Sequence, residues 1–335
     1  MPRAVAEQVV VITGASSGIG RETAIAFGRQ GASVVLAARN ETALNEVARE
    51  VERLGGQALP VVTDVAVWEQ VERLAGQAVA RFGRIDTWVN NAAISIYATV
   101  EQLTPDEIER VLRVNLLGQI YGMKAALPHL RRQHQGMIIN VASELAERAV
   151  PLQSAYCAAK HGIKGFTAAL RMELAYEQSG IAVTLVLPSS INTPLFANAR
   201  SKLGVKPKPI APVYEPRTVA EAILFAAEHP RRDIYVGGGG KFLSMLQRMS
   251  PSLVDRFMLQ GGQAFNQQRT EVPDDGQDNM FAPLSGTGSV TGDFGTHSQS
   301  VSLYTRVLGL HPNRERALVG LTLAGAMVMA RRAGR

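Results

Sequence analysis

A glycine-rich stretch near the start of the chain constrains the fold more than any other feature. The apolar residues 9–12 precede Thr13-Gly-Ala-Ser-Ser-Gly-Ile-Gly20, and residues 21–27 then have helical spacing. The glycines permit close backbone approach, and the free N–H groups at a helix start face an anion. The pattern predicts a dinucleotide-binding turn, although an ordinary strand-to-helix turn uses the same residue types.

Apolar strands and amphipathic helices alternate over the first 240 residues. Strands are predicted at 9–12, 34–38, 58–63, 85–89, 136–141, 181–187 and 233–236, and helices at 21–27, 41–54, 68–82, 105–132, 154–177 and 219–228. This alternation predicts an α/β fold, a doubly wound Rossmann sheet of about seven parallel strands with helices on both faces. The active site is expected at the carboxyl ends of the strands.

The sequence divides into four predicted regions. Residues 1–240 form the dinucleotide-binding and catalytic domain, in which 195–216 are expected to be a mobile loop over the site. Residues 241–268 predict one or two helices near the substrate site. Residues 269–302 are poor in large apolar side chains and predict a flexible linker.

The fourth region, 303–335, is a tail with a short apolar helix over the uncharged residues 317–330. A membrane span needs about 20 apolar residues. Packing of this helix on protein and weak attachment to a membrane therefore both remain open.

The composition indicates a folded protein without a nucleic-acid or metal site. Hydrophobic residues make up 46% and charged residues 19%, and the formal net charge is +6. No basic stripe with interleaved aromatic residues predicts nucleic-acid binding, and the six histidines lack metal-ligand spacing. The single cysteine, Cys157, excludes an internal disulfide, and the first residues lack a signal-peptide pattern. We expect a cytoplasmic protein, with peripheral or tail attachment to a membrane left open.

A tyrosine and a lysine four residues apart are candidates for acid–base chemistry. Tyr156 and Lys160 share one face of a predicted helix. A phenol has a pKa of about 10, and a neighbouring ammonium is expected to move it toward the working range. Ser143, at the end of a predicted strand, can donate a hydrogen bond to the same substrate oxygen. Such pairs are common on helix surfaces. This pair is a functional candidate because it follows a glycine-rich turn and a serine at a strand end.

The end of the second predicted strand bears on the choice of coenzyme. An acidic residue there would bind the adenosine ribose of NAD, but the sequence has Ala37, Ala38 and Arg39. A guanidinium can hold a 2′-phosphate with paired hydrogen bonds, whereas a carboxylate would repel it. Arg39 therefore favours NADP(H) over NAD(H), unless it is a plain surface arginine.

Together these motifs resemble those of the short-chain dehydrogenase/reductase family over about residues 8–238. In chain order, the matching residues are Thr13, Gly14, Gly18, Ile19, Gly20, Asp64, Asn90, Asn91, Ala92, Asn115, Ser143, Tyr156 and Lys160. The resemblance implies an oxidoreductase that interconverts a ketone or aldehyde and an alcohol with NADP(H). It also implies a homodimer or homotetramer formed through the helices 105–132 and 154–177.

The resemblance assigns roles to matching positions. It implies that Tyr156 donates the proton in reduction and accepts it in oxidation, while Lys160 tunes the tyrosine and holds the nicotinamide ribose. Ser143 would position the substrate oxygen, Asn115 would keep a water in a proton relay, and Asn90 would brace the sheet. The implied coenzyme-binding residues are Gly14, Ser16, Ser17, Gly18, Ile19, Gly20, Arg39, Asp64, Val65, Asn91, Ala92, Tyr156, Lys160, Pro188, Ile191 and Thr193.

Three positions depart from the family pattern, and other functions remain open. Ser189 and Ala93 replace usual glycines, and Ser17 stands where a basic residue is frequent. One alternative is an NADPH-binding regulator without turnover, and another is a membrane-associated reductase of lipid-like ketones. The methionines 245, 249 and 258 have core-like helical spacing, which favours core packing over an adaptable substrate mouth.

Overall fold

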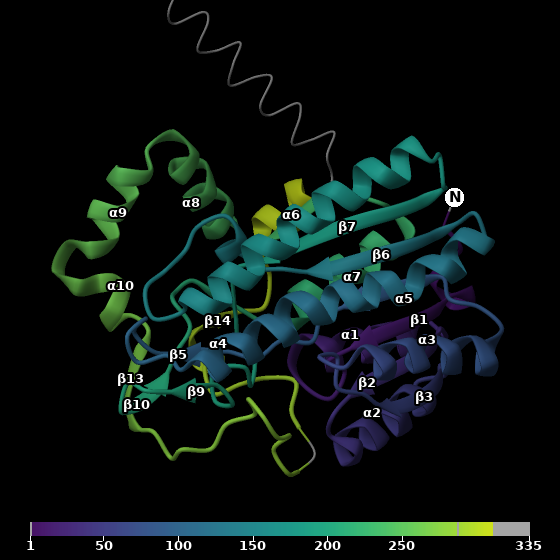
Figure 1. The fold of residues 1–335 in the computed structure, drawn as a ribbon, viewed down its shortest axis with the longest axis horizontal. Coiled ribbons are helices and arrows are strands. Elements are labelled where there is room, and N and C mark those ends of the chain that lie inside the picture. Colours follow the sequence, from purple (N-terminus) through teal and green to yellow (C-terminus); the bar gives the residue numbers. More distant parts are fainter. Residues whose placement is uncertain (1, 287, 311–335) are drawn as a thin grey trace, which may run out of the picture.

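A parallel sheet forms the centre of the structure, a computed structural model that describes residues 2–286 and 288–310 (Figure 1). Its seven strands lie in the order β12-β7-β6-β4-β1-β2-β3. They are β1 (Val9–Thr13), β2 (Ser33–Ala38), β3 (Gln57–Val62), β4 (Thr87–Asn90), β6 (Gly136–Val141), β7 (Ile181–Pro188) and β12 (Asp233–Val236). The order reverses between β1 and β4, which makes the sheet doubly wound, and the predicted fold class is confirmed.

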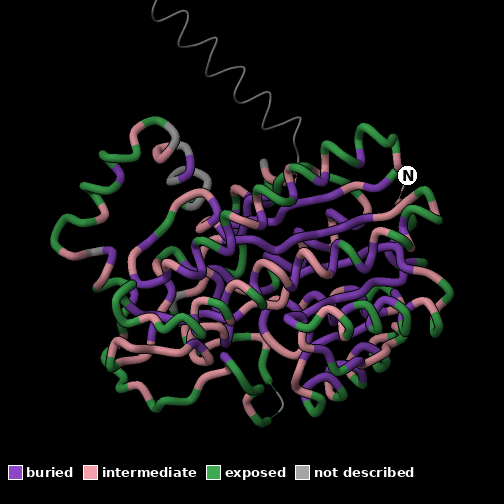
Figure 2. Tube along the Cα trace, viewed as in Figure 1, coloured by how far each residue is buried: buried purple, intermediate pink, exposed green. Residues whose placement is uncertain are grey.

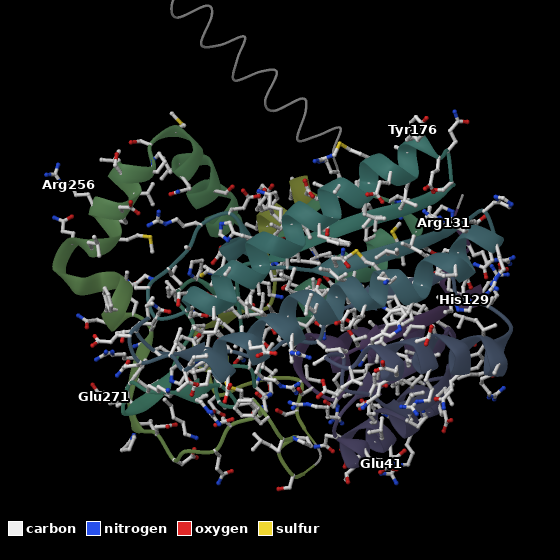
Figure 3. All side chains as sticks on the ribbon, viewed as in Figure 1. Glu41, His129, Arg131, Tyr176, Arg256 and Glu271 are labelled. Carbon is white, nitrogen blue, oxygen red and sulfur yellow. The ribbon has the colours of Figure 1, made fainter. Side chains whose placement is uncertain are left out.

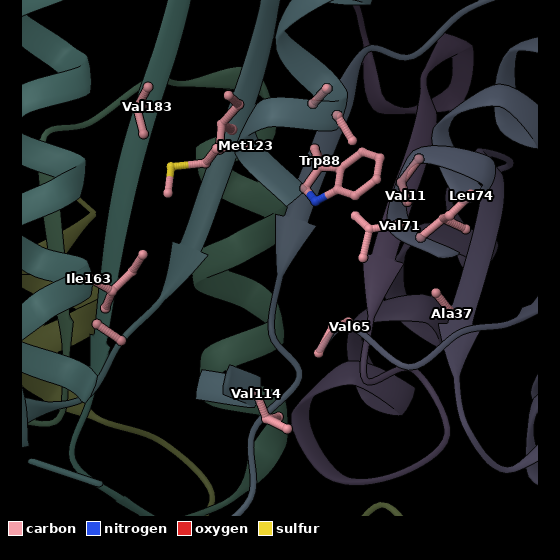
Figure 4. Close-up of a cluster of buried hydrophobic side chains, with 14 of the residues drawn as sticks. Val11, Ala37, Val65, Val71, Leu74, Trp88, Val114, Met123, Ile163 and Val183 are labelled. Carbon is pink, nitrogen blue, oxygen red and sulfur yellow. The ribbon is translucent and has the colours of Figure 1, made fainter. Parts of the chain in front are cut away.

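Helices cover both faces of this sheet. One face carries α1 (Gly18–Arg29), α2 (Glu41–Arg53) and α7 (Pro216–Glu228), and the other carries α3 (Trp68–Phe82), α4 (Pro105–Leu112), α5 (Gly118–Arg132) and α6 (Ser154–Tyr176). Alternate residues of β1 serve the two layers, with Val11 in one apolar cluster and Ile12 in the other. The buried residues therefore follow the strands (Figure 2), and Trp88 lies in the middle of the first cluster (Figure 4).

The predicted helix over 105–132 differs from the observed one in its middle. A π-helical turn, Arg113–Leu117, separates α4 from α5. It contains Asn115, which is fully buried and whose side chain accepts from the Ile94 N–H (2.9 Å) and donates to the Ile94 carbonyl (2.8 Å). Such π-helical turns are frequent at functional sites.

The segment 195–216, predicted as a loop, contains three short strands. These are β9 (Arg200–Ser201), β10 (Val205–Pro207) and β11 (Val213–Tyr214). They pair respectively with β5 (Ile96–Tyr97), with β13 (Arg269–Pro273), and with both β8 (Ser190–Ile191) and β14 (Ser298–Gln299). Two of the partners, β13 and β14, come from the region 269–302, so backbone pairing joins that region to the catalytic domain. Its predicted flexibility stays a prediction.

Three helices after the sheet stand apart at one end of the molecule (Figure 1). They are α8 (Gly238–Met249), α9 (Pro251–Leu259) and α10 (Gln263–Asn266), with the break between the first two at Ser250. Further along, the Thr305 hydroxyl accepts a hydrogen bond from the Gly237 N–H (3.1 Å). The predicted helix 317–330 lies outside the described residues, and within residues 2–286 and 288–310 no helix has the length and apolar character to cross a bilayer.

Candidate functional site

A cavity of about 1120 Å³ lies at the carboxyl ends of the strands. Residues that directly follow five strands line it, namely Gly14, Arg39, Asn91, Ala142 and Ser189. Because the sheet order reverses between β1 and β4, the connections after these two strands leave in opposite directions and open a crevice. Nearly all the predicted site residues line this one cavity: Gly14, Ser16, Ser17, Gly18, Ile19, Arg39, Asp64, Val65, Asn91, Ala92, Ser143, Tyr156, Lys160, Pro188, Ile191 and Thr193.

The glycine-rich turn forms one wall of the cavity. Gly14 and Gly18 have positive φ angles, +69° and +55°, which disfavour other residues. A Cβ on Gly20 would lie 2.1 Å from the Gly14 carbonyl oxygen, so Gly20 stands behind the cavity and lets the turn close. The Asn91 amide fixes the turn from the next strand by donating to the Thr13 carbonyl (3.1 Å). This cradle suits a phosphate, because the N–H groups at the start of α1 attract an anion; the Gly18 N–H itself donates to the Ser289 carbonyl (2.8 Å).

The candidate catalytic side chains meet opposite this turn. Tyr156 and Lys160 lie on α6 and are 7% and 1% exposed, and Ser143, which follows β6, is 8% exposed. Lys160 Nζ donates to the Val141 carbonyl (3.0 Å) and lies 5.4 Å from the ring centre of Tyr156. Tyr156 and Ser143 are hydrogen-bonded to each other. The hydroxyl groups are therefore placed to share one substrate oxygen.

The expected pKa shift of Tyr156 is wrong for this arrangement. Burial raises the pKa of Tyr156, the nearby Glu144 raises it further, and the hydrogen bond with Ser143 opposes both. Burial also lowers the pKa of Lys160 to about 7. Lys160 directs its amine at a backbone carbonyl, and burial is the largest cause of the raised pKa of Tyr156.

Buried amides brace the sheet behind the cavity. The Trp88 indole N–H donates to Asn90 Oδ1 (2.8 Å), Asn90 Nδ2 donates to Asn140 Oδ1 (2.9 Å), and Asn140 Nδ2 donates to the Thr167 hydroxyl (2.9 Å). The chain ties β4 and β6 to α6, which is the bracing role predicted for Asn90. Asn115 also lies behind the cavity wall, where its side chain holds the Ile94 backbone.

The Arg39 side chain binds backbone carbonyls from a distant part of the chain. Its guanidinium donates to the carbonyls of Asn279, Met280 and Phe281. Arg110 reaches the same place, where it donates to the Met280 carbonyl (2.9 Å) and to the Asp64 carboxylate (2.8 Å). Burial and the charge of Arg110 lower the pKa of Arg39. Two cations therefore stand at the expected adenosine end of the cavity.

Sequence reasoning missed two polar residues of the cavity. Burial raises the pKa of Glu144 to about 7, and this residue directly follows the candidate serine. The Ser189 hydroxyl, which stands where the family usually has glycine, is buried without a hydrogen-bond partner among the described residues. Its departure from the family pattern was the available signal, whereas Glu144 had none.

The other end of the cavity is apolar. Residues of α8 and α9 line it, together with Phe196 from the segment 195–216: Leu246, Met249, Leu253, Val254, Phe257 and Met258. Met249 is 80% exposed, so the prediction of core packing is wrong for this residue. Met249 instead lines the apolar end of the cavity, as the alternative of an adaptable substrate mouth predicts.

The chain is similar in sequence and fold to known oxidoreductases. Residues 8–204 match the family model described as short chain dehydrogenase. The uncharacterised oxidoreductase YxnA of Bacillus subtilis (strain 168) is 41% identical over 305 residues, which are 90% of this chain and 85% of that protein. Estradiol 17-beta-dehydrogenase 11 of Mus musculus is 32% identical over 257 residues, covering 76% and 83%. A solved alcohol dehydrogenase from the archaeon Thermococcus sibiricus, in complex with 5-hydroxy-NADP, has a TM-score of 0.59, 27% identity, and coverage of 68% of this chain and 95% of its own.

Proposed function

The chain belongs to the short-chain dehydrogenase family, and on that premise we propose that it interconverts a carbonyl and an alcohol with NADP(H). The observation that carries the proposal is the meeting of Tyr156, Ser143 and the glycine-rich turn around one cavity. The dinucleotide, when bound, supplies or accepts the hydride. The protein supplies placement and the proton.

The proton passes through Tyr156 in this proposal. In reduction the neutral phenol donates its proton to the carbonyl oxygen, and in oxidation the phenolate takes it back from the alcohol. Ser143 holds the same oxygen, and the Lys160 amine lies 5.4 Å from the tyrosine ring centre, where its protonated form offsets the charge of the phenolate. Tyr156→Phe is expected to lower kcat by roughly 10²–10⁴-fold and to leave NADPH binding within twofold. Loss of NADPH binding in this variant would contradict the assignment.

The coenzyme preference rests on Arg39 and its neighbour Arg110. Neither β2 nor the residue after it offers a carboxylate, and both guanidinium groups stand near the cavity's adenosine end. The test is fluorescence titration with NADPH and NADH. We expect NADPH to bind more tightly and Arg39→Glu to abolish the preference. Equal binding of the two coenzymes by the wild type would refute the proposed preference for NADP(H).

We expect an apolar substrate because of the side chains that α8 and α9 contribute. The name of the mouse relative, estradiol 17-beta-dehydrogenase 11, refers to an apolar secondary alcohol, which agrees with such a lining. Along a series of unbranched ketones, kcat/KM should rise about threefold to fourfold per methylene. Phe257→Ser should flatten the series. Leu259→Ser is the matched control, since Leu259 is 59% exposed on the same helix and does not line the cavity.

Two alternatives have their own tests. An NADPH-sensing regulator without turnover would leave every carbonyl unreduced, so any reduction lost in Tyr156→Phe excludes it. A membrane-associated reductase is tested by fractionation of the full chain against one that ends after Leu310. This end point keeps Thr305, which contacts the sheet domain. Equal distribution of the two chains would exclude attachment through 317–330.

We also propose a homodimer or homotetramer through α4–α5 and α6. The outer side of α6 leaves Phe166 39%, Met172 69% and Tyr176 92% exposed. Tyr176 projects away from the molecule in Figure 3. Light scattering should give a mass of two or four chains, and a mass of one chain would contradict the proposal.

A further inference from the structure

A segment from the C-terminal part of the chain crosses the mouth of the cavity. We call the described residues 279–286 and 288–294 the strap. It leaves the region of β13, passes beside the N-terminus of α2 and returns toward β14 (Figure 1). Asn279, Pro283, Leu284, Ser285, Gly288 and Ser289 of the strap line the same cavity as the glycine-rich turn.

Both ends of the strap are anchored. At the first end, the Met280 side chain is fully buried in the sheet's core cluster, and the neighbouring Asp278 pairs with Arg200 (2.7 Å). At the second end, Asn192 accepts hydrogen bonds from the Gly292 N–H (3.2 Å) and the Phe294 N–H (3.1 Å). These anchors fix where the strap begins and ends.

The middle of the strap is held by donors from the coenzyme side of the fold. Asn40 Nδ2 donates to the carbonyls of Leu284 (2.8 Å) and Gly286 (2.9 Å). Arg21 donates to the Gly288 carbonyl (3.2 Å), and the Gly18 N–H of the glycine-rich turn donates to the Ser289 carbonyl (2.8 Å). In each of these contacts the acceptor is a backbone carbonyl of the strap.

No described residue in the middle of the strap is fully buried, whereas Met280 at the first anchor is. Leu284 and Val290 are partly buried, and the other described residues between 282 and 291 are exposed. A segment fixed mainly by surface hydrogen bonds opens more readily than a packed one. Six residues of the strap line the cavity of about 1120 Å³, so the strap forms part of its wall.

We infer that the strap closes over the adenosine and pyrophosphate of the bound coenzyme and must open for exchange, with Asn40 as the positioning residue that holds it closed. The inference rests on the proposed coenzyme binding. Arg39 and Gly18 belong both to the predicted coenzyme site and to the strap's contacts, so the strap lies directly against the space the dinucleotide would take. Opening the strap should therefore limit the dissociation rate of coenzyme.

Asn40 allows a clean test because its side chain has two separable roles. Its Oδ1 caps α2 by accepting from the Ala43 N–H (2.9 Å), and only its Nδ2 binds the strap. Asn40→Ser and Asn40→Asp both keep a good capping oxygen and remove the amide donor. Asn45→Ser and Asn45→Asp are the controls, since Asn45 is exposed on the same helix.

The measurement is stopped-flow release of NADPH, followed by its fluorescence after a chase with excess NADP⁺. We expect both Asn40 variants to release NADPH at least tenfold faster than the wild type, and both Asn45 variants to stay within twofold. The serine variant adds no charge, so its agreement with the aspartate variant excludes repulsion of the phosphates as the cause. Unchanged release in both Asn40 variants would overturn the strap's role. A wild type that binds neither NADPH nor NADH would overturn the proposed function, and the strap's role with it.

Discussion

The amine of Lys160 lies 5.4 Å from the ring centre of Tyr156 and donates to the carbonyl of Val141. The lysine is thus beside the tyrosine without being directed at its hydroxyl. In this buried position the lysine's own charge is costly, because burial lowers its pKa to about 7. Its energetic cost and its catalytic value can therefore be measured separately.

Lys160→Met is expected to stabilise the protein while it lowers activity. The pKa of Lys160 is lower in the folded chain than in the unfolded chain, so the unfolded chain binds more protons between about pH 7 and pH 10.5. Wild-type stability therefore rises with pH through this window. The Val141 carbonyl keeps a donor, Gln119 (3.0 Å). The variant should gain roughly 2–4 kcal/mol in urea unfolding at pH 6 and nothing near pH 10. A gain independent of pH would point to packing alone.

Glu144→Gln is expected to act in the opposite pH direction. The carboxyl pKa is raised to about 7, so the cost of its charge appears as pH rises from about 4.5 through 7. Some solvent reaches the side chain, and the variant should therefore gain about 1–2 kcal/mol over the wild type at pH 8 and nothing at pH 4.5. The negative charge also raises the pKa of Tyr156. The pH midpoint of alcohol oxidation should consequently move lower in the variant. An unchanged midpoint would mean that the charge of Glu144 does not affect the pKa of Tyr156.

Gly20→Ala is expected to open the glycine-rich turn. The new methyl group would lie 2.1 Å from the Gly14 carbonyl oxygen, so the backbone must shift at a cost of roughly 1–3 kcal/mol. NADPH binding should weaken with it, which titration measures. Gly76→Ala is the control, because Gly76 lies within α3 with open space around it. The control should gain up to about 1 kcal/mol of stability from helix propensity.

Asn140→Leu is expected to be among the more destabilising single changes. It leaves Asn90 Nδ2 and the Thr167 hydroxyl without their partner in a region with no exposure. The expected loss is about 2–4 kcal/mol in urea unfolding, since each buried unpaired group costs about 1–3 kcal/mol. Thr167→Val removes only the last member and should cost less. Equal losses in the two variants would mean that the chain of amides does not act as a unit.

Much of the fold could be predicted because its signals are local. The apolar runs of β1 and β2, the glycines that follow β1 and the spacing of Tyr156 and Lys160 are all visible in a short window of sequence. The order of these windows predicts the sheet, since parallel strands joined by helices have few arrangements. The break between α8 and α9 lies at Ser250, directly before Pro251, and a proline in the first turn is a local signal for the start of a helix.

Other features depend on contacts between residues far apart in sequence. The π-helical turn places Asn115 where it bonds the distant Ile94 backbone. The pKa of Glu144 is raised because the folded chain buries this carboxyl group. An asparagine or a glutamate in a sequence does not by itself indicate such a position. The same holds for the pKa of Tyr156, which burial raises although a lysine stands beside it.

The sequence by itself determined the doubly wound sheet and the residues gathered at its carboxyl edge, because hydrophobic periodicity and glycine conformations act locally. Only the tertiary structure decided that the strap lies across that edge. Its described middle is mostly exposed, and it is recognised through backbone carbonyls, which every residue carries. A contact made by the backbone leaves no pattern in the side chains, so the sequence could not reveal it.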